Sequence, residues 1–209
     1  MLGRFVRLWG QARTGAGGFM RIALKIAAVL VVGALLGLAA TWFAVFRGTL
    51  AGGIADGPWR TSLEAGSSQG DIYLRARVAV HGLLALNRSE TIYYTTSTDG
   101  EGAALSGQCT YRIAGRDPPT RWWSITAYGA DDYLIPNPAG LYSASMHSVT
   151  RDASGKFTVT VSKAHAGGNW LPVGDGGFNL SLRLYNPNPS VAADPAHVAL
   201  PIIVKERCA

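Results

Sequence analysis

The most hydrophobic stretch of the chain is an uncharged run at residues 26–46. As an α-helix with a rise of about 1.5 Å per residue it would be about 31 Å long, close to the roughly 30 Å thickness of a bilayer's hydrocarbon core. Basic residues bracket the run and aromatic residues cluster at its far end, a pattern typical of a membrane span. These flanking residues are Arg21, Lys25, Arg47, Trp42, Phe43 and Phe46. We therefore predict a transmembrane helix at residues 26–46.

A cleaved signal peptide is the alternative interpretation, because Gly37-Leu38-Ala39 offers small residues at a cleavage site. The apolar run continues past Ala39 to Phe46, which favours an uncleaved anchor. Gly33 and Gly37 form a G-x-x-x-G pattern, which lets two membrane helices approach closely. We therefore expect two copies of this helix to associate weakly through these two glycines.

Beyond the apolar run, residues 47–68 are rich in glycine and contain Asp, Pro and Ser, so we predict a linker there. A helix is expected at residues 71–86, because apolar residues recur there at helical spacing, namely Ile72, Ala76, Ala79, Val80 and Leu83. Ser68 is the expected N-cap of this helix. We expect the apolar stripe to pack on the domain that follows and to leave Arg75 and Arg77 outside the core.

The rest of the chain alternates short runs of aromatic and β-branched residues with turn residues, which indicates strands. In two of these runs every second residue is apolar, at Phe157, Val159 and Val161 and again along residues 178–184, and we expect those residues to face inward. One helix followed by many short strands predicts a mainly β antiparallel sandwich of jelly-roll-like type, with one packed helix, over residues 69–209. The predicted strands are residues 91–97, 108–113, 121–128, 147–151, 156–162, 178–185 and 200–205.

Six short segments of this domain resemble the bacterial domain-of-unknown-function family 1214. They are residues 74–79 (LRARVA), 90–94 (ETIYY), 122–128 (WWSITAY), 135–137 (IPN), 169–172 (NWLP) and 182–187 (LRLYNP). In larger relatives the domain follows a second uncharacterised domain, whereas the span predicted here resembles a short membrane-anchored branch of the family. The resemblance implies a β-sandwich and a location in the bacterial envelope, and it implies no activity.

The net charge of +6 comes from the N-terminal segment. All charged residues before residue 48 are basic, six in number, whereas 13 basic and 13 acidic residues follow. This distribution disfavours a nucleic-acid-binding domain. It also favours a cytoplasmic segment at residues 1–25, because basic flanks remain on the cytoplasmic side. With the resemblance, it predicts a single-pass protein of the bacterial inner membrane whose C-terminal domain lies in the periplasm.

The sequence carries no recognisable catalytic or metal-binding motif. It has no G-x-S-x-G nucleophile motif, and its four histidines lie far apart from one another. We therefore expect no metal and no cofactor.

Aromatic residues are the main candidates for a binding site. Adjacent strand residues point to opposite faces of a sheet, so one of Trp122 and Trp123 is expected in the core while the other is free to line a groove. The candidate groove residues are Trp122, Trp123, Tyr128, Tyr133, Asn137, Asn169 and Trp170. The alternative is that the tryptophans fill the core and that the two asparagines bind loop backbone.

Two classes of function follow from these patterns. The first is a membrane-anchored, non-catalytic module that binds a glycan, a lipid or an envelope protein. The second is a periplasmic hydrolase or isomerase whose site uses Arg75 or Arg77 with a His and a carboxylate. A pocket that holds a His and a carboxylate within hydrogen-bonding distance would favour the enzyme, and an open groove lined with aromatic residues would favour binding.

Cys109 and Cys208 are the two cysteines, and both follow the predicted span. In an oxidising compartment we expect them to form a disulfide. The alternative is one buried thiol and one thiol in a loose C-terminal tail.

Membrane topology is directly testable. A reporter that is active only in the periplasm, fused to the C-terminus, should be active, because the basic flank keeps the N-terminus in the cytoplasm. The same reporter fused directly after Arg21, ahead of the span, should be inactive. An inactive C-terminal fusion would contradict the topology, and a mature N-terminus near residue 40 would contradict the uncleaved anchor.

Overall fold

In the computed structural model the described residues are 5–46, 53–80 and 85–208, with side chains described from Gly18 onward. The chain divides into two compact units, Met1–Gly48 and Thr49–Ala209. The first unit is the helix α1 (Phe5–Phe46), and the second contains all the strands.

Helix α1 contains a segment, Gly18–Phe46, that is long and apolar enough to cross a membrane. Its most apolar stretch has no buried residues, unlike the core helix of a soluble domain. Around Gly33 and Gly37 a Cβ atom would meet no other atom of the chain. The apolar helix is thus confirmed and begins earlier than predicted, while its insertion in a membrane and its self-association stay predictions.

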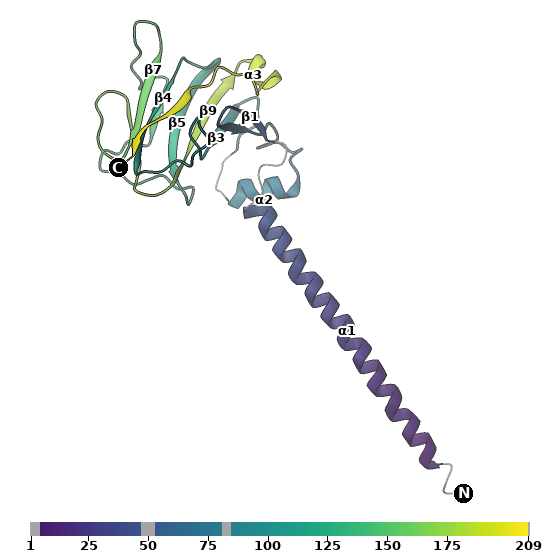
Figure 1. Cartoon of the computed structure of the whole chain (residues 1–209). Helices are drawn as coiled ribbons and strands as arrows, with labels where there is room; N and C mark the ends of the chain where they lie inside the picture. Colours follow the sequence, from purple (N-terminus) through teal and green to yellow (C-terminus); the bar gives the residue numbers. More distant parts are fainter. Residues whose placement is uncertain (1–4, 47–52, 81–84, 209) are drawn as a thin grey trace. The chain divides into compact units, whose positions relative to one another are not determined.

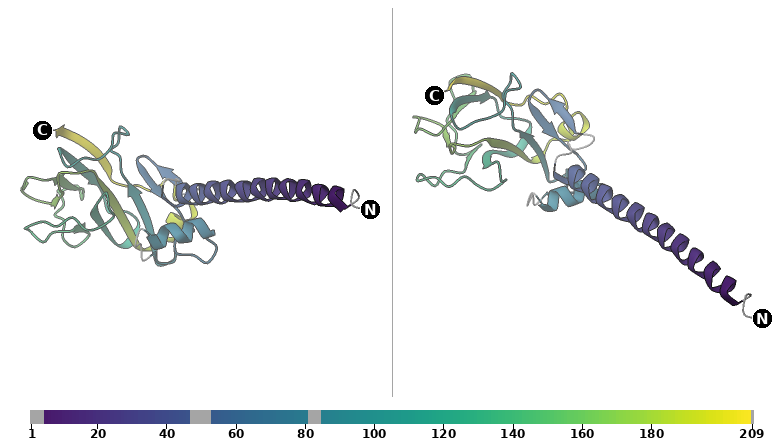
Figure 2. Two further views of the ribbon diagram at one scale, coloured as in Figure 1. Left: turned by 90° about the horizontal axis from the view of Figure 1, so that it is seen from below. Right: turned by 60° about the horizontal axis from the view of Figure 1, so that its bottom comes forward.

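The second unit is a β-sandwich of two sheets (Figure 1). The larger sheet has the strand order β1-β2-β3-β9-β5-β6, and the smaller has the order β10-β4-β7-β8. In sheet order, the larger sheet consists of β1 (Ile54–Asp56), β2 (Trp59–Thr61), β3 (Thr91–Thr96), β9 (Phe178–Pro187), β5 (Thr120–Gly129) and β6 (Ser143–Ser145). The smaller consists of β10 (Ile202–Cys208), β4 (Cys109–Gly115), β7 (Phe157–Ser162) and β8 (Trp170–Pro172). The C-terminal strand β10 lies at the edge of the smaller sheet (Figure 2).

The core forms where the inner faces of the two sheets meet. The expected alternation is confirmed, because Val159 and Val161 of one sheet and Leu180, Leu182 and Leu184 of the other are all fully buried. Aromatic contacts join the sheets: Trp123 stacks on Phe157 with 4.6 Å between the ring centroids, and Tyr111 meets Phe178 edge-on at 5.7 Å. Burying these side chains supplies the main stabilisation of the domain.

The predicted linker at residues 47–68 is wrong for its central part. Residues 54–61 form the β1–β2 hairpin, which pairs with β3 through Arg60 and Thr95. Trp59 is buried, and its indole N–H donates to the carbonyl of Pro201 at 2.9 Å. The domain therefore begins before residue 69. The glycine-rich composition hid two strands of only three residues each.

The predicted helix exists but is shorter and presents a different face. Helix α2 (Ile72–Val80) contains no buried residue, and Ile72 and Val80 of the expected apolar stripe are exposed. Asp71 rather than Ser68 is the N-cap, because its Oδ1 accepts hydrogen bonds from the backbone N–H groups of Tyr73 and Leu74. The end of the prediction, residues 81–84, lies outside the described residues.

Other differences concern elements too short to show periodicity. The expected strand at residues 147–151 contributes only an isolated bridge between Arg151 and Phe157. Strands β6 and β8 and the helix α3 (Pro189–Ala193) were not predicted. Strand β8 also runs parallel to β7, an exception in an otherwise antiparallel sandwich.

The expected disulfide joins Cys109 and Cys208. The two residues lie opposite each other in the pairing of β4 with β10, so the bond fixes the last strand to the sheet. It closes a loop over a sequence separation of 99 residues.

An aspartate in place of valine should destabilise the domain strongly in the core and only slightly on α2. Val159→Asp places an unpaired charge in the core and should lower the free energy of unfolding by about 3 kcal/mol or more. Val80→Asp on the exposed helix should change it by less than about 0.5 kcal/mol. Thermal unfolding of the full chain in detergent measures both. A loss of stability in Val80→Asp as large as that in Val159→Asp would show that α2 belongs to the core.

The disulfide should contribute strongly to stability. Cys208→Ser opens a loop of about 100 residues, for which chain entropy gives an upper value of roughly 4.7 kcal/mol. Loss of about 2 to 5 kcal/mol is expected, measured as the difference in denaturant unfolding between the oxidised parent and the variant. Reduction of the parent should reproduce that loss. A parent that alkylates at both cysteines under denaturing, non-reducing conditions would contradict the bond.

Candidate binding pocket on the outer face of the larger sheet

The outer face of the larger sheet is polar and aromatic, unlike a purely solvated face. On β9 the residues that alternate with the buried leucines are Asn179, Ser181, Arg183 and Tyr185. Strand pairing sets Tyr93 beside Arg183 and Thr95 beside Ser181 on the β3 side. On the β5 side it sets Thr126 beside Ser181 and Tyr128 beside Asn179. Three neighbouring strands thus bring their polar residues onto one surface.

A pocket of about 850 Å³ lies over this surface. Its floor comes from β3, β9 and β5, and further lining comes from the β1–β2 hairpin, from α2 and from Leu86. The lining residues include three arginines and one aspartate, so the pocket carries a net positive charge. The charged lining residues are Arg60, Arg77, Arg183 and Asp132, and the aromatic ones are Tyr93, Tyr128 and Tyr185.

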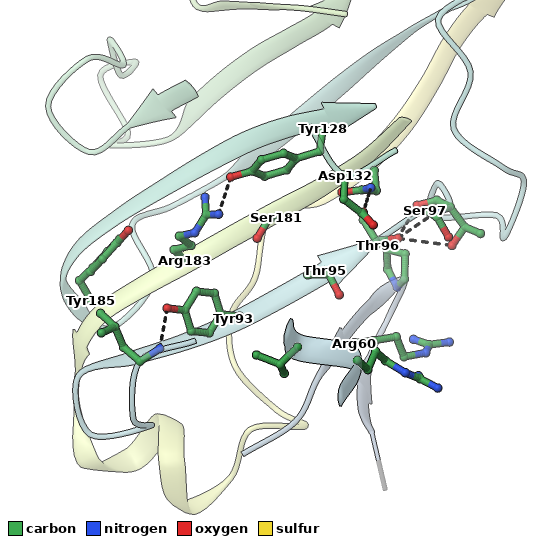
Figure 3. A pocket seen from close by; sticks show the side chains of 16 residues that line it. Arg60, Tyr93, Thr95, Thr96, Ser97, Tyr128, Asp132, Ser181, Arg183 and Tyr185 are labelled. Carbon is green, nitrogen blue, oxygen red and sulfur yellow. Dashed lines mark hydrogen bonds between the residues drawn. The ribbon is translucent and has the colours of Figure 1, made fainter. Parts of the chain in front are cut away.

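Arg183 lies at the centre of the pocket floor, between two tyrosine rings (Figure 3). Its guanidinium carbon is 5.9 Å from the ring centroid of Tyr93 and 5.4 Å from that of Tyr128, within the range of cation–π attraction. One guanidinium N–H donates to the Tyr128 hydroxyl at 2.5 Å and another to Thr126 Oγ1 at 3.1 Å. These contacts hold the guanidinium in a fixed orientation above the sheet.

Hydrogen bonds also fix the rim of the pocket. The Tyr93 hydroxyl accepts the backbone N–H of Leu86 at 3.1 Å and so connects the segment after α2 to the sheet. Asn179 donates from its amide to Asp132 Oδ1 at 3.1 Å (Figure 3). Asp132 adopts a positive φ of 64° in the loop after β5. The pocket is therefore a preformed feature of the domain.

The floor also contains an unsatisfied polar group. Ser181 is 2% exposed, and its hydroxyl has no hydrogen-bond partner among the described residues. Arg183 bonds Thr126, the neighbour of Ser181 across the strand pair, so the guanidinium lies over the row that contains Ser181. Buried hydroxyls in native proteins normally have a partner.

Of the residues expected to line a groove, Tyr128 lines this pocket and Trp122 lies beside it. Trp122 packs on the lining residue Tyr185, with 5.0 Å between ring centroids. Tyr133 is exposed and lines a separate cavity of about 410 Å³ with Ile135 and Gly174.

The other expected groove residues lie elsewhere. Trp123 is fully buried in the core and donates from its indole N–H to Asp117, which also accepts from Arg151. Burial of Asp117 opposes its ionisation, yet the hydrogen bonds from Arg151 and Trp123 lower the pKa of this carboxyl overall. Trp170 donates to the carbonyl of Ser162.

The two asparagines bind loop backbone, as in the alternative interpretation. Asn137 donates to the carbonyls of Ile135 and Leu141 and accepts the N–H of Leu141. Asn169 donates to the carbonyls of Thr150 and Thr158 and accepts the N–H of Thr150. The seven expected groove residues therefore do not line one common pocket.

The described residues that line the pocket do not include the acid–base arrangement expected for the enzyme. They contain Asp132 and no histidine, and His81 lies outside the described residues. A His–carboxylate pair occurs elsewhere, where His197 Nδ1 lies 2.9 Å from Asp194 Oδ1. The Asp194 carboxylate raises the pKa of His197, but both side chains are mostly exposed. Of the two arginines proposed for catalysis, Arg77 lines the pocket and Arg75 is exposed.

Metal ligation finds no support in the described part of the chain. Its His, Cys, Asp and Glu side chains form no group of three or more that could hold a metal ion.

Sequence reasoning missed the residues that matter most here, namely Tyr93, Ser181, Arg183 and Tyr185. A signal for three of them was present, because they are the polar half of the alternation in residues 178–185. A polar half usually indicates a solvated face. These polar residues form a pocket floor because β9 pairs with β3 on one side and with β5 on the other. The alternation within a single strand does not specify that strand order.

Comparison with known proteins identifies a family and similar folds. Residues 90–189 match the family described as protein of unknown function (DUF1214). The matched segment contains β3 to β9, and with them most of the pocket floor. No curated protein matches the chain.

Two solved structures are similar to the domain. The VPA0106 protein from Vibrio parahaemolyticus is 23% identical, with a TM-score of 0.56 over 66% of this chain and 36% of that chain. A putative uncharacterized protein from Burkholderia cenocepacia is 14% identical, with a TM-score of 0.46 over 82% of this chain and 41% of that chain. The matched part of this chain thus covers less than half of either protein. The first similarity supports the fold alone.

Proposed function

Because residues 90–189 belong to the DUF1214 family, whose description gives no activity, we propose a function from the pocket itself. The chain is a membrane-anchored bacterial envelope protein whose β-sandwich binds a small polar ligand without transforming it. Helix α1 provides the anchor in the inner membrane, and the domain lies in the periplasm.

The observation that carries this proposal is the preformed pocket on the larger sheet. Its volume of about 850 Å³ lies in the range of small-molecule sites, roughly 300–1,000 Å³. Its walls combine tyrosine rings with an oriented arginine and several hydroxyls, which suits a ligand that has both apolar and polar parts.

Among the three expected partner classes, the concave shape favours a glycan or a lipid headgroup over an envelope protein. Protein partners need a larger surface, about 800 Å² on each side. A hydrolase or isomerase remains the second candidate because Arg77 and Asp132 line the same pocket. Binding is the stronger proposal, since none of the described residues that line the pocket is a histidine that could serve as an acid or a base.

Blocking the pocket tests this function. Thr95→Trp places a large ring on the pocket floor, whereas Thr158→Trp places the same ring on an exposed position of β7 in the other sheet. The full chain in detergent is screened by saturation-transfer NMR against a library of small polar aromatic and sugar fragments. Fragments should bind the parent and Thr158→Trp and should lose binding to Thr95→Trp.

Thermal unfolding and circular dichroism first verify that both variants are folded. Fragments that bind all three proteins equally would show that the pocket is not the site. A parent that binds no fragment would contradict the proposal. Turnover of a bound fragment, seen as new NMR signals, would favour the enzyme instead.

A further inference from the structure

Arg183 is a partly buried cation that no described residue of the domain neutralises. All of its polar contacts are to the hydroxyls of Thr126 and Tyr128, and none of the ion pairs in the described part of the chain includes it. A charge removed from water without a counter-ion is costly, and attraction to two aromatic rings offsets only part of that cost.

The guanidinium retains donors for a ligand. Arginine carries five N–H donors in a planar fork, and the structure uses two of them. The remaining three suffice for the paired hydrogen bonds by which arginine holds a carboxylate or a phosphate. Because Tyr93 and Tyr128 fix the plane of the fork, little side-chain entropy remains to be lost on binding.

The other charges of the pocket also favour an anionic ligand. Arg60 is exposed, and its guanidinium donates to the backbone carbonyls of Gly57 and Trp59. Asp132, the acidic residue of the lining, accepts a hydrogen bond from Asn179. Because Arg77 also lines the pocket, the described lining has three arginines and one carboxylate, which suits a ligand group with a negative charge.

The ligand's body also has a defined environment. Tyr93 and Tyr128 flank the guanidinium, and Tyr185, Val78 and Leu86 add apolar lining. The unsatisfied hydroxyl of Ser181 lies in the floor below. A ligand with its charged end on Arg183 would have its apolar or sugar-like body against these rings.

We propose that this pocket selects ligands that carry an oxyanion, a carboxylate or a phosphodiester, and that Arg183 is the residue that binds it. The inference rests on the proposed function and specifies its ligand class. The same oxyanion chemistry has two sources in an envelope: a soluble organic acid, or the phosphodiester of a lipid headgroup.

Matched charged and neutral probes test the inference on the full chain in a non-ionic detergent. Indole-3-acetate is compared with indole-3-acetamide, and dihexanoylphosphatidylglycerol with dihexanoylglycerol, by calorimetric titration. At least one anion should bind the parent about tenfold or more tightly than its neutral analogue, because it gains charge-assisted hydrogen bonds. Preference for the carboxylate indicates a soluble acid, and preference for the phosphodiester indicates a lipid headgroup.

Arg183→Met should weaken binding of the preferred anion by about tenfold or more and leave the neutral analogue unchanged. Arg183→Lys keeps the charge but not the fork, so it should retain part of the affinity and should keep the preference for the anion. Arg112→Met is the matched control, because Arg112 pairs with Glu206 on the other sheet. It should bind every probe as the parent does.

Several outcomes would overturn the inference. Equal affinity for charged and neutral probes, with both lost in Thr95→Trp, would leave the binding function intact and refute the role of the oxyanion. Anion binding that survives in both Arg183 variants without loss would place the charge recognition elsewhere. Failure of both anions to bind the folded parent also overturns it.

Discussion

Strand β9 is hydrogen-bonded to β3 along one edge and to β5 along the other, and the rest of the domain depends on this double pairing. Its leucines at 180, 182 and 184 face the smaller sheet and are fully buried. Strict alternation then obliges the residues between them to face the opposite way. A shift of the register by one residue would move Arg183 into the core and the leucines to the outside. The same constraint thus fixes both the core and the pocket floor.

The outer face of β9 carries groups that would be unusual on a purely structural surface. A sheet face that only meets water needs neither a guanidinium held between two tyrosine rings nor a hydroxyl without a partner. A fully covered face would favour apolar residues, because an unpaired cation and an unsatisfied hydroxyl both reduce stability. The face that carries Arg183 and Ser181 is neither fully exposed to solvent nor fully covered by another element. It forms the floor of a preformed pocket, where polar groups are available to bind a ligand. This combination is typical of functional surfaces, where local stability is lower than it could be.

The elements that sequence reasoning located correctly are those whose periodicity extends over six or more residues. The alternation of β7 and β9 and the long apolar helix are of this kind, and their inward and outward faces followed directly. Strands β1, β2, β6 and β8 have three residues each, too few to show a period, and they are held by their neighbours in the sheet. Trp59 illustrates the point, because its burial depends on Pro201, 142 residues further along the chain.

Helix α2 was predicted correctly as a helix, but the face that it turns toward the domain was not. Its nine residues contain apolar side chains on more than one side, so spacing alone allows more than one stripe to face the domain. The stripe at Ile72 and Val80 is exposed, whereas Val78 and Arg77 line the pocket.

The pocket could not be located from sequence for a related reason. Tyr93, Arg183 and Tyr128 come from three strands that are separated by many residues in the chain and become neighbours only through the order β3-β9-β5. The predicted groove was built instead from residues 122–137 and 169–170, which were chosen for their aromatic and amide side chains. Trp123, Asn137 and Asn169 from that set have their polar groups bonded within the domain. Arg183 is distinguished from them by a charge that two hydroxyls and two rings orient and that has no counter-ion in the part of the chain that the structure describes. An oriented charge of this kind is a stronger indication of a ligand than aromatic content, because aromatic side chains also serve to fill a core, whereas an anion that binds a partly buried cation offsets the cost of burying it.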